Sequence, residues 1–168
     1  MNALRYLALA CLLPLAGCGS FGGSSLVAGQ SRQADVEAAM GAPSDRVKLP
    51  NGDTAIYYSR LPYGRRMYVA TITPDGMLRA FDQRLTRENF ARIAVNSSTG
   101  PQVRELLGPP DRVARMPRQQ RDVWEYPWLE VEEKRMLWVQ FSYDGTVREV
   151  IEMHDFESDP PSGPLTGD

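Results

Sequence analysis

Residues 31–43 and 98–110 share one pattern of apolar and polar positions. In each segment three apolar residues fall at positions i, i+3 and i+4, which places them on one side of a helix. A serine that can cap a helix start precedes each stripe, and a glycine and a proline that stop a helix follow it. Each segment therefore predicts a short helix. The residues concerned are Ser31, Val36, Ala39, Met40, Gly41 and Pro43 in the first segment, and Ser98, Val103, Leu106, Leu107, Gly108 and Pro110 in the second.

Three stretches rich in β-branched and aromatic residues follow each of these helices, as is typical of strands. The second and third stretch of each set are separated by an Asp-Gly pair, Asp75-Gly76 or Asp144-Gly145, which favours a tight hairpin. A further helix at 87–94, capped by Thr86, precedes the second set. The predicted strands are 55–59, 67–73 and 77–81 in the first set and 123–126, 136–143 and 147–153 in the second.

The order of one helix and three strands thus occurs twice. Short matching segments also align the two copies. Asp45-Arg46-Val47, for example, matches Asp111-Arg112-Val113. The period exceeds that of common solenoid repeats, so two tandem copies of one small unit explain it better. We predict an α+β fold with unit 1 at 29–84 and unit 2 at 85–154. Each unit should pack helical segments on a three-stranded antiparallel meander.

The N-terminus carries an apolar run, Tyr6 to Leu13, after a single cation, Arg5. The run is shorter than the roughly 20 apolar residues that span a bilayer, and it is typical of a secretory signal peptide. It ends in Leu15-Ala16-Gly17-Cys18, which resembles a bacterial lipobox. We predict a signal peptide at 1–17 and lipid attached to Cys18; the alternative is an ordinary signal peptide with a chance cysteine.

The lipobox resemblance implies a membrane anchor through the lipid on Cys18. In many Gram-negative bacteria a residue other than aspartate after the cysteine, here Gly19, favours the outer membrane. Residues 18–28 are rich in glycine and serine, which predicts a flexible tether. Residues 155–168 combine prolines, glycines and acids, which predicts a disordered tail. We therefore expect a lipid-anchored protein on the periplasmic side of the outer membrane.

Cysteine usage and charge exclude several classes of function. The only two cysteines are Cys11, within the signal peptide, and Cys18, which the lipid would consume. The mature chain would then have no thiol for a disulfide, a metal or redox chemistry. The formal net charge of −2 gives no general reason to bind nucleic acid.

Few residues can be combined into a catalytic or metal site. The single histidine, His154, ends the last predicted strand, and the neighbouring Asp155 would point to the opposite face of that strand. The acids within 130–133 and the arginines within 115–121 fit solvated loops better than a reactive centre. We predict no catalytic residues, no metal, no cofactor and no small-molecule substrate.

The aromatic residues are the most informative side chains for binding, because exposed tryptophan and tyrosine are typical of interaction hot spots. On the predicted strand 136–143, Trp138 falls on the opposite face from the apolar residues at 137, 139, 141 and 143. We select Trp124, Tyr126 and Trp138 as candidate protein-binding residues, although most rings in such a fold pack in the core.

The motif Gly-x-Ser/Thr-x-x-x-x-Val-x-x-x-Leu/Met-Gly-x-Pro, followed by a meander with Asp-Gly, resembles the SmpA/OmlA (BamE-like) lipoprotein family. That family shares its layout with the β-lactamase inhibitor protein fold. The second copy has Asn96 where glycine is usual, and asparagine tolerates a positive φ better than most residues. The first copy fits through Gly29, Ser31, Val36, Met40, Gly41 and Pro43, and the second through Ser98, Val103, Leu107, Gly108 and Pro110.

The resemblance implies a non-enzymatic accessory protein that binds envelope proteins, including the β-barrel assembly machinery, and supports outer membrane assembly or integrity. Family members typically carry one unit, whereas this chain carries two. The alternative is therefore an inhibitor or binder of a periplasmic enzyme. An apolar and broad sheet surface would favour the accessory protein, and a protruding loop such as Glu130–Lys134 would favour the inhibitor.

Overall fold

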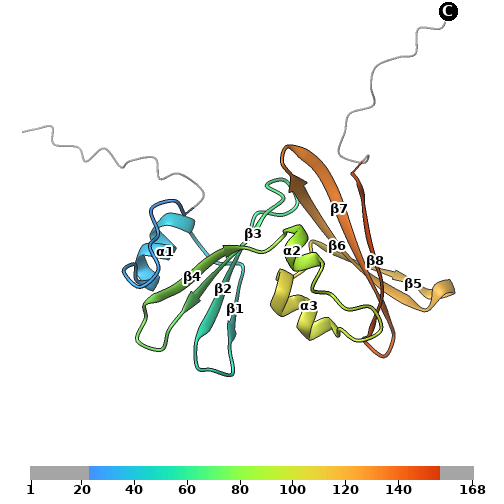
Figure 1. Cartoon of the computed structure of the whole chain (residues 1–168), viewed down its shortest axis with the longest axis horizontal. Helices are drawn as coiled ribbons and strands as arrows, with labels where there is room; N and C mark the ends of the chain where they lie inside the picture. Colours follow the sequence, from blue (N-terminus) through green and yellow to red (C-terminus); the bar gives the residue numbers. More distant parts are fainter. Residues whose placement is uncertain (1–22, 156–168) are drawn as a thin grey trace, which may run out of the picture.

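The computed structural model describes residues 23–155 (Figure 1). The predicted signal peptide 1–17, Cys18 and the tail beyond Asp155 lie outside these residues. No helix in the described part is long and apolar enough to cross a membrane. The elements in chain order are α1 (Gln33–Met40), β1 (Asp45–Lys48), β2 (Thr54–Ser59), β3 (Met67–Ile72), β4 (Leu78–Gln83), α2 (Arg87–Phe90), α3 (Gly100–Leu107), β5 (Arg112–Met116), a 3-10 turn η1 (Pro117–Gln119), β6 (Arg121–Glu130), β7 (Glu133–Ser142) and β8 (Val147–His154).

The strands form two antiparallel sheets in sequential order, β1-β2-β3-β4 (the first sheet) and β5-β6-β7-β8 (the second sheet). The α+β class is confirmed, but each sheet has four strands rather than the predicted three. The additional strands, β1 and β5, are short and carry mostly exposed or half-exposed side chains. They are held by backbone pairing with β2 and β6. A periodicity analysis misses them because they are short and contain no fully buried residue, Val47 being only partly buried against the core.

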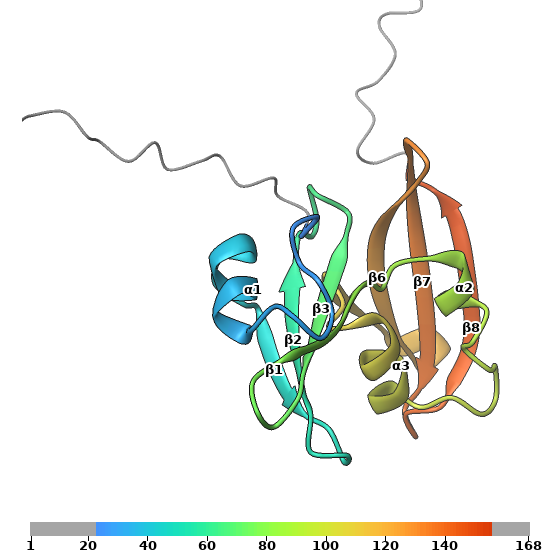
Figure 2. The same ribbon diagram turned by 60° about the vertical axis from the view of Figure 1, so that its left-hand side comes forward.

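The helices and sheets alternate in layers: α1, the first sheet, α2 with α3, and the second sheet (Figures 1 and 2). One apolar cluster lies between α1 and the inner face of the first sheet. A second, larger cluster joins the outer face of the first sheet, α2 and α3, and the inner face of the second sheet. The first sheet is therefore covered on both faces by helices, and the second sheet on one.

The ends of α1 and α3 follow one local pattern. Gly41 and Gly108 end the two helices with positive φ, as predicted. The predicted serine caps are wrong by one residue, because Arg32 and Thr99 occupy the cap positions. Ser31 and Ser98 instead accept hydrogen bonds through Oγ from the backbone N–H groups of residues 27 and 94. Each helix thus begins two residues after the serine that closes the preceding turn.

Four further local predictions concern the helix at Thr86, Asn96, residues 23–28 and Asp155. Thr86 caps α2 by accepting from the Asn89 N–H at 3.4 Å, but α2 ends at Phe90 and is shorter than predicted. Asn96 has a positive φ, like Gly29 in the first copy.

Residues 23–28, predicted as the end of a tether, form turns against unit 1, because Leu26 packs on its core. Asp155, predicted as the start of the tail, is buried.

Candidate protein-interaction surface

The second sheet presents one face that no helix in the described part of the chain covers (Figure 1). Successive residues of a strand point to opposite faces, and directly paired residues share a face. The register therefore defines this open face. It comprises Arg112, Ala114 and Met116 on β5, Arg121, Val123, Glu125 and Pro127 on β6, Met136, Trp138 and Gln140 on β7, and Glu149, Ile151 and Met153 on β8.

The centre of the open face is apolar. Trp138 pairs with Ile151, and Met136 pairs with Met153; all four side chains are half-buried. Val123 is fully buried although it belongs to neither helix-covered cluster, so the neighbouring side chains on the face cover it. Rows of partly exposed apolar side chains of this kind are typical of protein interaction sites.

One ion pair is set into this face. Arg112 donates to the Glu125 carboxylate at 2.8 Å, and Glu125 is only 5% exposed. Arg112 itself is largely exposed and lies at the sheet edge, so the ion pair stands at the rim of the face. The polar rim around an apolar centre matches the general anatomy of protein interfaces.

A loop of unit 1 reaches the same face. Arg65, between β2 and β3, donates to the Asp155 carboxylate at 2.5 Å and to the Arg135 carbonyl at 3.3 Å. Both partners of the Arg65–Asp155 ion pair are buried, so it fixes the loop of unit 1 against unit 2. Neighbouring Tyr63 is 95% exposed. The loop and the sheet together enclose a hollow of about 670 Å³, which Pro62, Tyr63, Arg112, Glu125, Pro127 and Met136 help to line.

The three aromatic candidates lie in different environments. Trp138 is on the open face, as the alternation on its strand predicted. Trp124 lies on the helix side, where its ring packs against Phe141 at 4.6 Å between centroids. Tyr126 is fully buried, its hydroxyl donates to the Gly108 carbonyl at 3.1 Å, and burial raises its pKa. The predicted exposure of Tyr126 is therefore wrong, because β6 turns that residue toward α3.

No local pattern in the chain singles out the neighbours of Trp138. Met136, Ile151 and Met153 join it only through the strand register, and Tyr63 comes from the other unit. The repeat does carry a signal, since Trp138 stands where the first unit has the smaller Val69.

The side chains considered for chemistry stay apart. Asp155 pairs with Arg65, and Glu130 pairs with Arg87 and Arg135. Those ion pairs lower the pKa of Glu130, chiefly through the hydrogen bond from Arg87. Among residues 23–155, no three side chains of His, Cys, Asp or Glu gather as a metal site. The loop predicted at Glu130–Lys134 is a two-residue turn between β6 and β7 rather than a protruding loop.

The comparisons with known proteins concern structure alone. No protein-family model matches the chain, and no curated protein matches it. The chain is similar to a DUF4309 family protein (YjgB) from Bacillus subtilis, with 20% identity over 79% of this chain and 84% of that one and a TM-score of 0.32. It is also similar to a "putative beta-lactamase inhibitor protein" from Streptococcus mutans, with 12% identity over 73% of this chain and 82% of that one and a TM-score of 0.31.

Proposed function

We propose that this chain is a non-catalytic, BamE-like lipoprotein that is anchored to the outer membrane through Cys18 and binds envelope proteins through the open face of its second sheet. One observation carries the binding part. The two sheets are built alike, yet α3 covers the outer face of the first sheet, while no helix among the described residues covers the equivalent face of the second sheet.

The covered face of the first sheet indicates what kind of element fits such a surface. The backbone N–H groups of Ser44 and Asp111 bond to the carbonyls of Tyr57 and Glu125, which aligns the two sheets residue by residue. In this alignment Val69 corresponds to Trp138, because each pairs with one of the aligned residues. The C-terminal end of α3 lies over Tyr57 and Met67. A helix of a partner protein would occupy the equivalent place on the open face.

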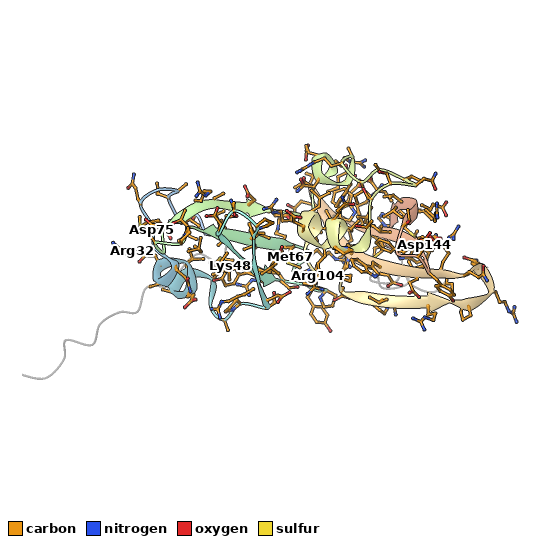
Figure 3. The ribbon with its side chains drawn as sticks, turned by 90° about the horizontal axis from the view of Figure 1, so that it is seen from below. Arg32, Lys48, Met67, Asp75, Arg104 and Asp144 are labelled. Atoms are coloured by element: carbon orange, nitrogen blue, oxygen red, sulfur yellow. The ribbon has the colours of Figure 1, made fainter. Side chains whose placement is uncertain are left out.

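The charged residues at the sheet edge limit which charges that partner helix should carry. On the first sheet, Arg104 of α3 donates to Asp45 of β1 at 2.5 Å, at the junction of the units (Figure 3). In the strand register the residue equivalent to Asp45 is Arg112, one residue beyond the Asp111 with which the sequence repeat matches it, since Asp45 pairs with Tyr57 and Arg112 with Glu125. The sign is therefore reversed. The partner helix should not carry arginine where α3 does, because a second cation beside Arg112 would be repelled.

The alternative, a binder or inhibitor of a periplasmic enzyme, is supported by a different feature. The β2–β3 loop projects Tyr63 almost fully into solvent beside the hollow on the open face. An exposed aromatic on a loop that a buried ion pair holds in place is suited to enter a cleft of a partner.

A crosslinking experiment tests the proposed surface. A photoreactive amino acid placed at Ile151, on the open face, should form an adduct with an envelope protein in living cells. The same amino acid at Ala38, which is exposed on α1, provides the control and should not form that adduct. Adducts with β-barrel assembly components would support the accessory protein, and an adduct with one soluble enzyme would favour the inhibitor. Equal adducts from both positions, or a dimer of this chain alone, would overturn the proposed function.

The anchor needs its own test. Cys18→Ser removes the thiol that would receive the lipid, so the protein should lose incorporated palmitate and leave the membrane fraction. Retention of the label in the Cys18→Ser variant would contradict the lipobox assignment.

A further inference from the structure

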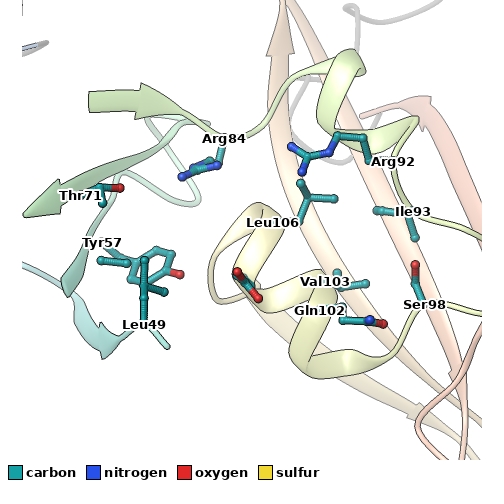
Figure 4. Close-up of a pocket in the computed structure, with 12 residues that line it drawn as sticks. Leu49, Tyr57, Thr71, Arg84, Arg92, Ile93, Ser98, Gln102, Val103 and Leu106 are labelled. Atoms are coloured by element: carbon teal, nitrogen blue, oxygen red, sulfur yellow. The ribbon is translucent and has the colours of Figure 1, made fainter. Parts of the chain in front are cut away.

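A second concave site lies on the other side of α3, between the two units. A cavity of about 320 Å³ separates the outer face of the first sheet from the helices of unit 2 (Figure 4). Its size is at the lower end of the range for small-molecule pockets. Tyr57 and Arg84 line it from the first sheet, and Arg92, Gln102 and Leu106 line it from unit 2. It is separate from the open face.

Two guanidinium groups line this cavity, and neither is hydrogen-bonded to a carboxylate of the described residues. Arg84 has its nearest acid, Asp82, at 3.6 Å, and its buried Nε has no hydrogen-bond partner in the described part of the chain. Arg92 donates to the amide oxygen of Asn89 at 3.2 Å and forms no ion pair with any described residue. By contrast, Arg104 at the same junction holds an acid at 2.5 Å. A carboxylate in the cavity would give the terminal nitrogens of these guanidinium groups charge-assisted hydrogen bonds that no described acid supplies.

Tyr57 adds a neutral donor. The residue is 2% exposed and lines the cavity, and its hydroxyl forms no hydrogen bond with any described residue. Burial raises its pKa, so the hydroxyl keeps its proton at neutral pH and can donate. Figure 4 shows the ring of Tyr57 on the sheet side of the space, with Arg84 and Arg92 at one end of it.

The remaining lining limits the ligand. Ile93, Val103 and Leu106 provide an apolar wall. Glu105 is the one carboxylate among the lining residues, so the cavity carries two positive charges and one negative charge. A ligand with a single negative charge and an apolar body satisfies both features, whereas a dianion would be repelled by Glu105.

We propose that the cavity between the units binds a small monocarboxylate with an apolar body. The planar carboxylate would accept from Arg84, Arg92 and the Tyr57 hydroxyl, since guanidinium groups match the geometry of carboxylates. The apolar body would lie against Leu106 and its neighbours. At about 30 Å³ per water molecule, the cavity has room for a ligand of roughly ten non-hydrogen atoms. This site goes beyond the proposed protein-binding function and does not depend on it.

Calorimetric titration of the mature protein with benzoate and with hexanoate tests the proposal. Saturable binding is expected, with the dissociation constant raised roughly tenfold or more in Arg84→Gln and Arg92→Gln, because each loses charge-assisted hydrogen bonds. Tyr57→Phe should weaken binding less. Arg118→Gln removes the same charge from an exposed position far from the cavity and provides the matched control.

A loss of binding could also result from a variant that fails to fold, so a variant that should gain binding is needed as well. Glu105→Gln removes the carboxylate, so it should bind inorganic phosphate more tightly than the native protein while retaining benzoate binding. Absence of saturable binding of either carboxylate by the native protein would overturn the proposal. Affinities unchanged in the Arg84→Gln and Arg92→Gln variants would overturn it as well.

Discussion

The two sheets of this protein have the same topology but different surroundings. The first sheet lies between α1 on one side and α2 with α3 on the other, whereas the second has helices on one side only. On the outer faces, Val69 of the first sheet corresponds to Trp138 of the second, and Tyr57 corresponds to Glu125. The two copies therefore share a backbone arrangement but carry different side chains on their outer faces.

This difference teaches that the layer next to a sheet, rather than the strand pattern, determines which side chains its outer face can carry. Where α3 approaches, a glycine lies directly against Tyr57 and Met67. Where no helix approaches, the larger Trp138 and the paired charges of Arg112 and Glu125 are accommodated. Matched substitutions at equivalent positions of the two units test whether the two outer faces differ in coverage.

The largest difference is expected from the same substitution at the equivalent positions. Val69→Lys would bury a charge between the first sheet and α3, which should lower the free energy of unfolding by on the order of 4 kcal/mol. Trp138→Lys should lower it by only about 1–2 kcal/mol, because lysine on the open face reaches solvent. Urea denaturation measures both. Equal losses in the two variants would mean that the two faces are equally covered.

A smaller contrast concerns the glycines that end α1 and α3. Gly41 (φ 77°, ψ −156°) and Gly108 (φ 87°, ψ −176°) occupy a backbone region that is essentially restricted to glycine, so alanine strains either position by roughly 1–3 kcal/mol. A Cβ at Gly108 would also lie 2.8 Å from Cγ of Met67, whereas at Gly41 it would meet nothing within 4 Å. Gly108→Ala should therefore lose about 1–3 kcal/mol more than Gly41→Ala. Thermal unfolding of the pair measures this difference, and identical midpoints would argue against tight packing of α3 on the first sheet.

Phenylalanine substitutions at two equivalent tyrosines should differ in their effect on the free energy of unfolding by about 1–2 kcal/mol. Tyr126 donates to the Gly108 carbonyl, while the buried hydroxyl of Tyr58, at the same position in unit 1, has no partner among the described residues. Tyr126→Phe leaves a buried carbonyl without its donor and should be destabilising. Tyr58→Phe should be neutral or slightly stabilising, since it removes an unsatisfied group. Chemical denaturation distinguishes the two, and a larger loss in Tyr58→Phe would reverse the assignment.

The sequence was sufficient for the elements whose burial follows a simple period. The helix stripe ending at Gly108 and the alternation around Trp138 predicted both the element and the face. The edge strands β1 and β5 were not predicted, because Asp45–Lys48 and Arg112–Met116 are held in strands by backbone pairing. No periodic signal marks such pairing in the sequence.

The contact between the units was beyond local patterns. A stripe of apolar residues shows that α3 packs on a sheet, but not that a second sheet approaches its other side. For the same reason Arg84 and Arg92 gave no sign of facing one cavity. The burial of Tyr126 within its own unit was missed because β6 carries apolar residues on both faces. Such features depend on how the repeated units stack, which neither repeat encodes alone.

The smallest expected effect compares the two Asp-Gly turns under acid. The Ser142 hydroxyl donates to Asp144 at 2.5 Å and, with the Thr146 N–H and Arg148, holds the pKa of Asp144 at about 2. A pKa below that of the unfolded chain, about 3.9, means that ionised Asp144 stabilises the fold above pH 4 and that this contribution disappears as the pH falls toward 2. The stability difference between the native protein and Asp144→Asn should therefore shrink over that window.

The matched turn in unit 1 sharpens this last test. The Thr73 side chain also lowers the pKa of Asp75, but the arginine of that copy, Arg79, donates to Asp53 at 2.7 Å instead of to the turn. Asp75→Asn should consequently change the acid dependence of unfolding less than Asp144→Asn does. Urea denaturation of both variants at pH 2, 4 and 6 measures the two dependences. A larger acid effect in Asp75→Asn would show that Arg148 does not distinguish the second turn from the first, although both turns share the same Asp-Gly sequence.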